Sequence, residues 1–86
     1  MEQASQVASP FMTTATRIRE IAADPEQVRA VVPPSDDEAI LFREPYTGRI
    51  CLKVAIEDEF DIDIDEDEAA TCSSVSDWAA LVGRMR

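Results

Sequence analysis

The chain has 86 residues, of which 45% are hydrophobic and 6% aromatic, and its 18 acidic against 8 basic side chains give a formal net charge of −10. A chain of this length forms one domain and is too short to enclose a large active site. A field of this sign repels nucleic-acid phosphates and anionic membranes, so we expect protein partners with basic patches and no binding to either.

Absent residue types and segments narrow the expected function further. The chain has no histidine, which removes the usual general base and the commonest zinc ligand. No stretch approaches the roughly 20 apolar residues of a membrane span, and residues 1–10 do not read as an export signal. We therefore expect a cytoplasmic protein that is not an enzyme, holds no cofactor and is a monomer when free. Cys51 and Cys72 are expected to be reduced.

Residues 1–12 are predicted to be a flexible lead-in, and residues 13–86 a helical domain. The first predicted helix starts at Thr13 or Thr14, either of which is a suitable cap. Its apolar residues recur at spacings of three and four, which is the stripe of an amphipathic helix. They are Ala15, Ile18, Ile21 and Ala22.

A short second helix is predicted to begin at Asp24-Pro25, because aspartate caps helices and proline is tolerated at the first helical position. Val28, Val31 and Val32 are expected to face the core, and Pro33-Pro34 ends the helix. Residues 35–38 are then predicted to cap a short turn. That turn carries Ile40, Leu41 and Phe42.

After a break at residues 43–48, the apolar period of residues 50–60 predicts a longer helix. The apolar period of that helix is carried by Ile50, Val54 and, a turn later, Ala55 and Ile56. Residues 61–64 alternate with period two, but no second strand exists to pair with them. We predict an extended connector whose Ile62 and Ile64 enter the core.

Residues 65–72 are predicted to form one short helix, and a last helix follows a cap at Ser74 or Ser76. The buried side of that helix is predicted to be Trp78, Leu81, Val82 and Met85. The fold class predicted from the whole pattern is all-α.

The segments Ile56-Glu57-Asp58-Glu59-Phe60-Asp61-Ile62-Asp63-Ile64 and Ser74-Val75-Ser76-Asp77 together resemble the acyl carrier protein family. In that family an acidic cluster and Phe end the second helix, and an Ile-x-Ile connector, a short third helix and a last helix follow. The match is good over residues 50–86 and weak before them. The resemblance implies a small bundle of three main helices plus a short one.

The resemblance also implies that the carrier function is lost. Carriers bear a phosphopantetheine arm on the serine of an Asp-Ser-Leu triplet at the start of the second helix. Counting back from Glu57 places Pro45-Tyr46-Thr47 on that triplet, so Tyr46 stands where the modified serine belongs. We expect no arm. The face that carriers show to their enzymes is acidic, whereas here Arg49, Cys51 and Lys53 occupy much of it.

Three functions follow as hypotheses. The first is a non-catalytic carrier-like partner in a fatty-acid, polyketide or nonribosomal-peptide pathway, which docks to a pathway enzyme or another carrier protein. Its expected contact residues are Tyr46, Arg49, Cys51, Lys53 and Glu57. The second is an acidic adaptor or inhibitor that blocks a basic protein surface with residues 57–68. The third is a functional carrier modified at a non-standard site.

The acidic residues invite a metal-binding alternative, because Asp61, Asp63 and Asp65 have the first spacings of an EF-hand loop. The rest of that pattern fails. Glu66 stands at the position that requires glycine, and Cys72 stands at the position of the closing glutamate. We therefore predict no dedicated metal site and interpret the run as a solvated acidic face.

Overall fold

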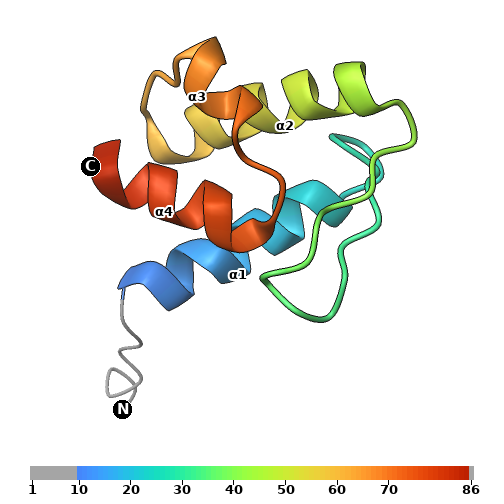
Figure 1. The fold of residues 1–86 in the computed structure, drawn as a ribbon, viewed down its shortest axis with the longest axis horizontal. Helices are drawn as coiled ribbons and strands as arrows, with labels where there is room; N and C mark the ends of the chain where they lie inside the picture. Colours follow the sequence, from blue (N-terminus) through green and yellow to red (C-terminus); the bar gives the residue numbers. More distant parts are fainter. Residues whose placement is uncertain (1–9, 86) are drawn as a thin grey trace.

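The computed structural model describes residues 10–85, with side chains described from residue 14 onward. Regular structure in these residues consists of α1 (Pro10–Ala23), α2 (Pro45–Phe60), α3 (Glu66–Ala70) and α4 (Val75–Met85). The predicted all-α class is confirmed. As Figure 1 shows, α1 packs against α4 and α2, and α3 lies close to α2. None of these described helices has the length and apolarity needed to cross a bilayer.

The first helix begins at Pro10, before the predicted start, so Thr13 and Thr14 lie within α1 and do not cap it. Of the predicted lead-in, residues 10–12 are helical and residues 1–9 lie outside the described residues. The predicted apolar stripe of α1 is confirmed, since every member of it is less than 5% exposed. That stripe meets the buried side of α4.

In α4 the predictions of buried Trp78, Leu81 and Val82 are confirmed, with each side chain 0% exposed. The prediction for Met85 is wrong, because it is 39% exposed in a last turn that is exposed throughout. Trp78 is buried so completely that its indole Nε1 has no acceptor among the described residues. The core therefore forms around α1 and the first two turns of α4.

The predicted short helix after Asp24 is a single turn. The backbone oxygen of Asp24 accepts hydrogen bonds from the amides of Gln27, Val28 and Arg29 at 3.1, 3.1 and 2.9 Å. Its side chain accepts another from the Glu26 amide at 2.9 Å. Arg29 then adopts a left-handed backbone with φ 57°, which stops the helix.

Only part of the apolar set predicted for residues 28–42 is buried. Val28, Val32 and Phe42 pack against the core and Ile40 is inside it. Val31 and Leu41 are 62% and 59% exposed, so the prediction for Val31 is wrong. These two residues exchange a pair of backbone hydrogen bonds of 2.9 and 3.0 Å, which hold both side chains on the surface.

Arg19 of α1 anchors the long segment between α1 and α2. Its Nε donates to the Asp36 carboxylate at 2.6 Å, and its Nη2 donates to the carbonyls of Pro33 and Pro34 at 2.7 Å each. The Asp36 carbonyl in turn accepts from the Ser76 amide of α4 at 2.9 Å. A segment without regular structure is thereby held in place by polar contacts to two helices.

The longest helix, α2, begins at Pro45 and not at residue 50, with proline at its first position. Of the predicted apolar set, Ile56 is buried and Ala55 packs against the core, whereas Ile50 and Val54 are exposed. The buried residues of α2 are Gly48, Leu52 and Ile56. Phe42 packs directly on Gly48, where an added Cβ would lie only 2.6–2.9 Å from three Phe42 side-chain atoms. This close approach fixes which side of α2 faces inward.

The extended connector after α2 is confirmed. Asp61, at φ 56°, ends α2 in a left-handed cap, as is common at helix C-termini. Ile64 is buried and Ile62 packs against the core. The Ile64 amide donates to the Glu57 side chain at 2.8 Å, so this acidic residue fixes the connector.

The predicted short helix within residues 65–72 and the predicted cap at Ser74 are also confirmed. The Ser74 hydroxyl accepts from the Asp77 amide at 3.2 Å. The Asp77 carboxylate accepts in return from the Ser73 and Ser74 amides at 2.9 and 3.2 Å, which is the reciprocal pattern of a capping box. Ser76, the other predicted cap, lies within α4 and donates to Asp37.

Candidate functional site

An uncovered apolar row runs along α2. Tyr46, Ile50 and Val54 follow one another at four-residue intervals, so they lie on one face of the helix. Their exposed fractions are 78%, 39% and 46%. Because Gly48, Leu52 and Ile56 already fill the buried side, nothing in the described residues covers this row, which we call the α2 row.

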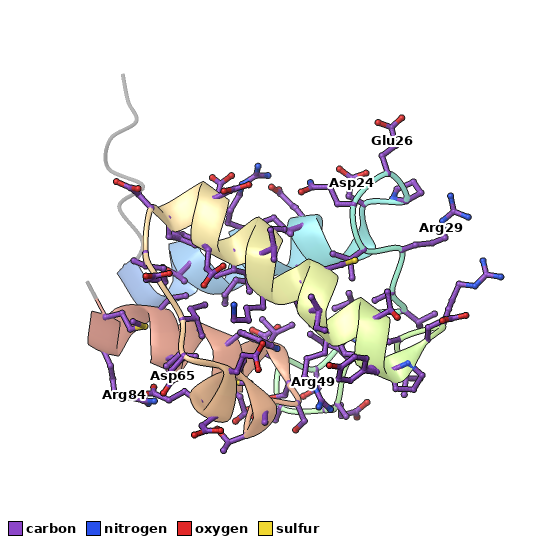
Figure 2. The ribbon with its side chains drawn as sticks, turned by 90° about the horizontal axis from the view of Figure 1, so that it is seen from above. Asp24, Glu26, Arg29, Arg49, Asp65 and Arg84 are labelled. Atoms are coloured by element: carbon purple, nitrogen blue, oxygen red, sulfur yellow. The ribbon has the colours of Figure 1, made fainter. Side chains whose placement is uncertain are left out.

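A cleft of about 230 Å³ adjoins the α2 row on the side of α3. Its walls come from α2 (Tyr46, Arg49, Ile50, Lys53) and from α3 (Glu66, Asp67, Ala69, Ala70). Figure 2 shows Arg49 on the α3 side of α2, with Arg29 and its turn beyond the opposite side. The cleft therefore combines an apolar lining with both signs of charge.

Arg49 is a cation without a counter-ion in this cleft. Its Nε is buried and has no hydrogen-bond acceptor among the described residues. None of its side-chain nitrogens makes an ion pair or hydrogen bond to a described residue, although Glu66 and Asp67 line the same cleft. An Arg guanidinium offers five donors in a planar fork, so this one can still accept an anionic group.

Lys53 and Glu57, two of the predicted contact residues, are bound to one another. The Lys53 ammonium lies 3.2 Å from the Glu57 carboxylate, and each side chain is only 17% exposed. Glu57 also accepts from the Ile64 amide. Both side chains are therefore parts of the joint between α2 and the connector, although Lys53 also borders the cleft.

Cys51 lies on the other side of α2 from the cleft. It is half-buried and lines a polar hollow of about 390 Å³ together with Arg29, Arg43 and Thr47. Cys72 is a core residue, and burial, followed by the charge of Asp77, raises the pKa of its thiol. Both thiols are free. The five predicted contact residues thus do not form one surface, since only Tyr46, Arg49 and Lys53 share the cleft.

The acidic run from residue 57 to residue 68 contains nine carboxylates. Three of them pair with Lys53, Arg17 and Arg84, whereas the other six make no ion pair within the described part of the chain. Those six are Asp58, Asp61, Asp63, Asp65, Glu66 and Asp67. No group of three or more potential ligands among residues with described side chains is arranged to hold a metal ion.

The paired carboxylates serve the fold. Arg17 of α1 donates to Glu59 of α2 through two nitrogens, with distances of 2.9 and 3.0 Å. Hydrogen bonding from Arg17 lowers the pKa of the Glu59 carboxyl and raises the pKa of the guanidinium. This pair ties α1 to the end of α2, and neither residue lines the cleft.

Sequence reasoning missed two parts of the candidate site. The apolar period groups Ile50 and Val54 with Ile56, whereas Ile56 is buried and the other two are surface residues of the α2 row. The sequence predicts Glu66 and Asp67 only as part of the acidic face of residues 57–68 and does not place them, Ala69 or Ala70 beside Arg49, because the approach of α3 to α2 depends on how the connector folds back. Glycine at position 48, four residues before Leu52, was the available signal for the true inward face.

Comparisons with protein-family models, with curated proteins and with solved structures found no match to this chain.

Proposed function

We propose that this is a non-catalytic, carrier-like helical protein that binds a partner protein through the α2 row and the adjoining cleft. The observation that carries the proposal is the exposure of Tyr46, Ile50 and Val54 along a single helix face. Contiguous exposed apolar side chains with a polar rim are typical of protein interaction sites.

The chemistry around the cleft supports binding over catalysis. Tyr46 is 78% exposed and makes no hydrogen bond to any described residue, so no base is positioned to activate its phenol. The partner we propose is an enzyme or another carrier protein of a fatty-acid, polyketide or nonribosomal-peptide pathway. That assignment comes from the sequence resemblance of residues 50–86 to acyl carrier proteins and from the order of three longer helices and one short helix.

Two pairs of substitutions test the docking face. A protein captured from the native host would be purified, and its affinity for the chain measured by calorimetry. We expect Tyr46→Ser with Val54→Ser to weaken binding at least tenfold, as hot-spot residues do. Val31→Ser with Leu41→Ser is the matched control, since these exposed apolar side chains lie outside α2. Equal losses for both pairs, or none for the first, would refute the proposed face.

Modification with a phosphopantetheine arm is the competing carrier hypothesis. Intact mass would be measured after incubation with coenzyme A and a promiscuous transferase. We expect no increase, because Tyr46 and Thr47 replace the attachment serine. An increase of one arm would establish a carrier modified at a non-standard site.

Six carboxylates of residues 58–67 make no ion pair with any residue whose side chain is described, and they favour a second candidate function, an acidic adaptor that covers a basic protein surface. Exposed charge pairs are screened over about 8 Å at physiological ionic strength. Adaptor binding should therefore collapse at high salt, whereas binding through the apolar α2 row should largely persist. The same calorimetric titration at low and high salt separates the two functions.

A further inference from the structure

The cleft between α2 and α3 has the size of a pocket for a single side chain. Its volume of about 230 Å³ is smaller than the roughly 300–1,000 Å³ of typical small-molecule sites. It opens beside the α2 row, which continues along the helix to Val54. A partner segment that lies on the α2 row can therefore place one side chain in the cleft.

The charges in the cleft determine which chemical group on the partner's side chain can bind there. Lys53 is neutralised by Glu57 at 3.2 Å, so Arg49 is the cation that lacks a counter-ion among the cleft residues. The buried Nε shows that the stem of Arg49 is packed, and its Nη nitrogens, which make no hydrogen bond within residues 14–85, remain for an incoming acceptor. A carboxylate matches the guanidinium fork and gives a charge-assisted hydrogen bond.

The acidic side chains that border the cleft also affect which anionic group can enter it. Glu66 and Asp67 border the cleft, so a doubly charged phosphate would meet stronger repulsion than a singly charged carboxylate. The same two side chains favour basic residues on either side of the entering carboxylate. The walls from Ile50, Ala69 and Ala70 suit the methylene groups of a glutamate.

We propose that Arg49 anchors a glutamate side chain from a partner segment in which lysine or arginine residues flank that glutamate. This proposal rests on the proposed function, because it names the group that the docking face receives. It assigns Arg49 as the specificity-determining residue of the cleft, with Glu66 and Asp67 selecting the basic flanks.

Two blocked tripeptides, acetyl-Lys-Glu-Lys-amide and acetyl-Lys-Gln-Lys-amide, test the proposal by NMR titration of the labelled full chain. Attraction to the net charge of −10 alone predicts tighter binding of the glutamine peptide, which has the same two lysines but lacks the negative charge of the glutamate. Recognition by Arg49 predicts the reverse order. We expect the glutamate peptide to bind several-fold more tightly and to shift the Arg49 Nε–H signal in a saturable way.

Arg49→Met removes the charge while it keeps most of the stem, and it should abolish the preference for the glutamate peptide. Arg43→Met is the matched control, because it makes the same change of charge outside the cleft and should keep the preference. An unchanged circular dichroism spectrum would confirm that both variants fold. Equal or tighter binding of the glutamine peptide, or a preference that survives in Arg49→Met, would overturn the proposal.

The outcome of the peptide titration is independent of the test of the docking face, which measures binding of the partner protein. If the peptide preference is absent but Tyr46→Ser with Val54→Ser still weakens partner binding, the carboxylate anchor is wrong and the docking function stands. If those two substitutions leave partner binding unchanged, the docking function itself is wrong.

Discussion

At the scale of single residues, several charged side chains stabilise the fold through hydrogen bonds to backbone groups. Asp77 caps the start of α4 by accepting from two amides, and Glu57 accepts from the Ile64 amide. Arg19 donates to one carboxylate and two carbonyls. Arg49 differs from these because it makes no such contact among the described residues, which is why it stands out as a site for a partner.

The cap at Asp77 predicts a dependence of stability on pH. The hydrogen bond from the Ser73 amide, with those from Ser74, lowers the pKa of Asp77 against an opposing effect of burial. A carboxyl whose pKa is lower in the folded state stabilises the fold above its unfolded pKa of about 3.9. That contribution is lost as the pH falls through the folded-state pKa.

We therefore expect Asp77→Asn to reduce the free energy of unfolding at pH 7, and the difference from the parent protein to shrink as the pH falls below about 4. Urea unfolding followed by circular dichroism between pH 7 and pH 3 measures the free energy of unfolding of both proteins. Asp63→Asn, at an exposed position with no ion pair in the described structure, is the control. A difference for Asp77→Asn that stayed constant down to pH 3 would show that ionisation of the cap is unimportant.

At the scale of elements, the side that α2 turns inward is set by a residue outside the helix, Phe42. Two rows of residues at four-residue spacing, 46–50–54 and 48–52–56, both contain apolar side chains. The second row is buried because Phe42 packs on Gly48, where there is no side chain in the way. The first row is left exposed and becomes the candidate docking face.

This role of Gly48 predicts opposite effects of one substitution at two helical glycines. Gly48→Ala should reduce the free energy of unfolding by about 1–3 kcal/mol, because the new methyl group meets the Phe42 ring and Cβ. Gly83→Ala should raise it by about 0.5–1 kcal/mol, since nothing lies within 4 Å and alanine favours helix. Urea denaturation measures both, and a stabilising Gly48→Ala would contradict the proposed packing.

At the scale of the whole molecule, the net charge of −10 opposes compaction. The repulsion is concentrated in the six carboxylates of residues 58–67 that have no ion pair within the described structure. Salt screens such exposed charges, so the folded state should gain stability as ionic strength rises. The same concentration of charge makes residues 58–67 the basis of the alternative adaptor function.

We expect the melting temperature at pH 7 to be higher in 0.5 M than in 0.02 M NaCl. A gain of about 1 kcal/mol corresponds to roughly 4–8 °C in a domain of this size. The doubly substituted Asp63→Asn, Asp67→Asn protein should show a smaller rise, because it begins with less repulsion. A melting temperature that fell with salt would mean that the ion pairs of Arg17, Lys53 and Arg84 outweigh this repulsion.

The amino-acid sequence determined the all-α class, the buried stripes of α1 and α4, the connector with its two isoleucines, and the Ser74 cap. These follow from local physics, because helix periodicity and capping depend on residues three or four positions apart. Only the tertiary structure decided which row of α2 is buried, that residues after Asp24 form one turn, and that α3 lies beside Arg49. The inward row of α2 depends on Phe42, which lies outside the helix and packs on Gly48, and the place of α3 depends on how the connector folds back. The turn after Asp24 is followed by the backbone pairing of Val31 with Leu41. Helix periodicity and capping specify none of these contacts.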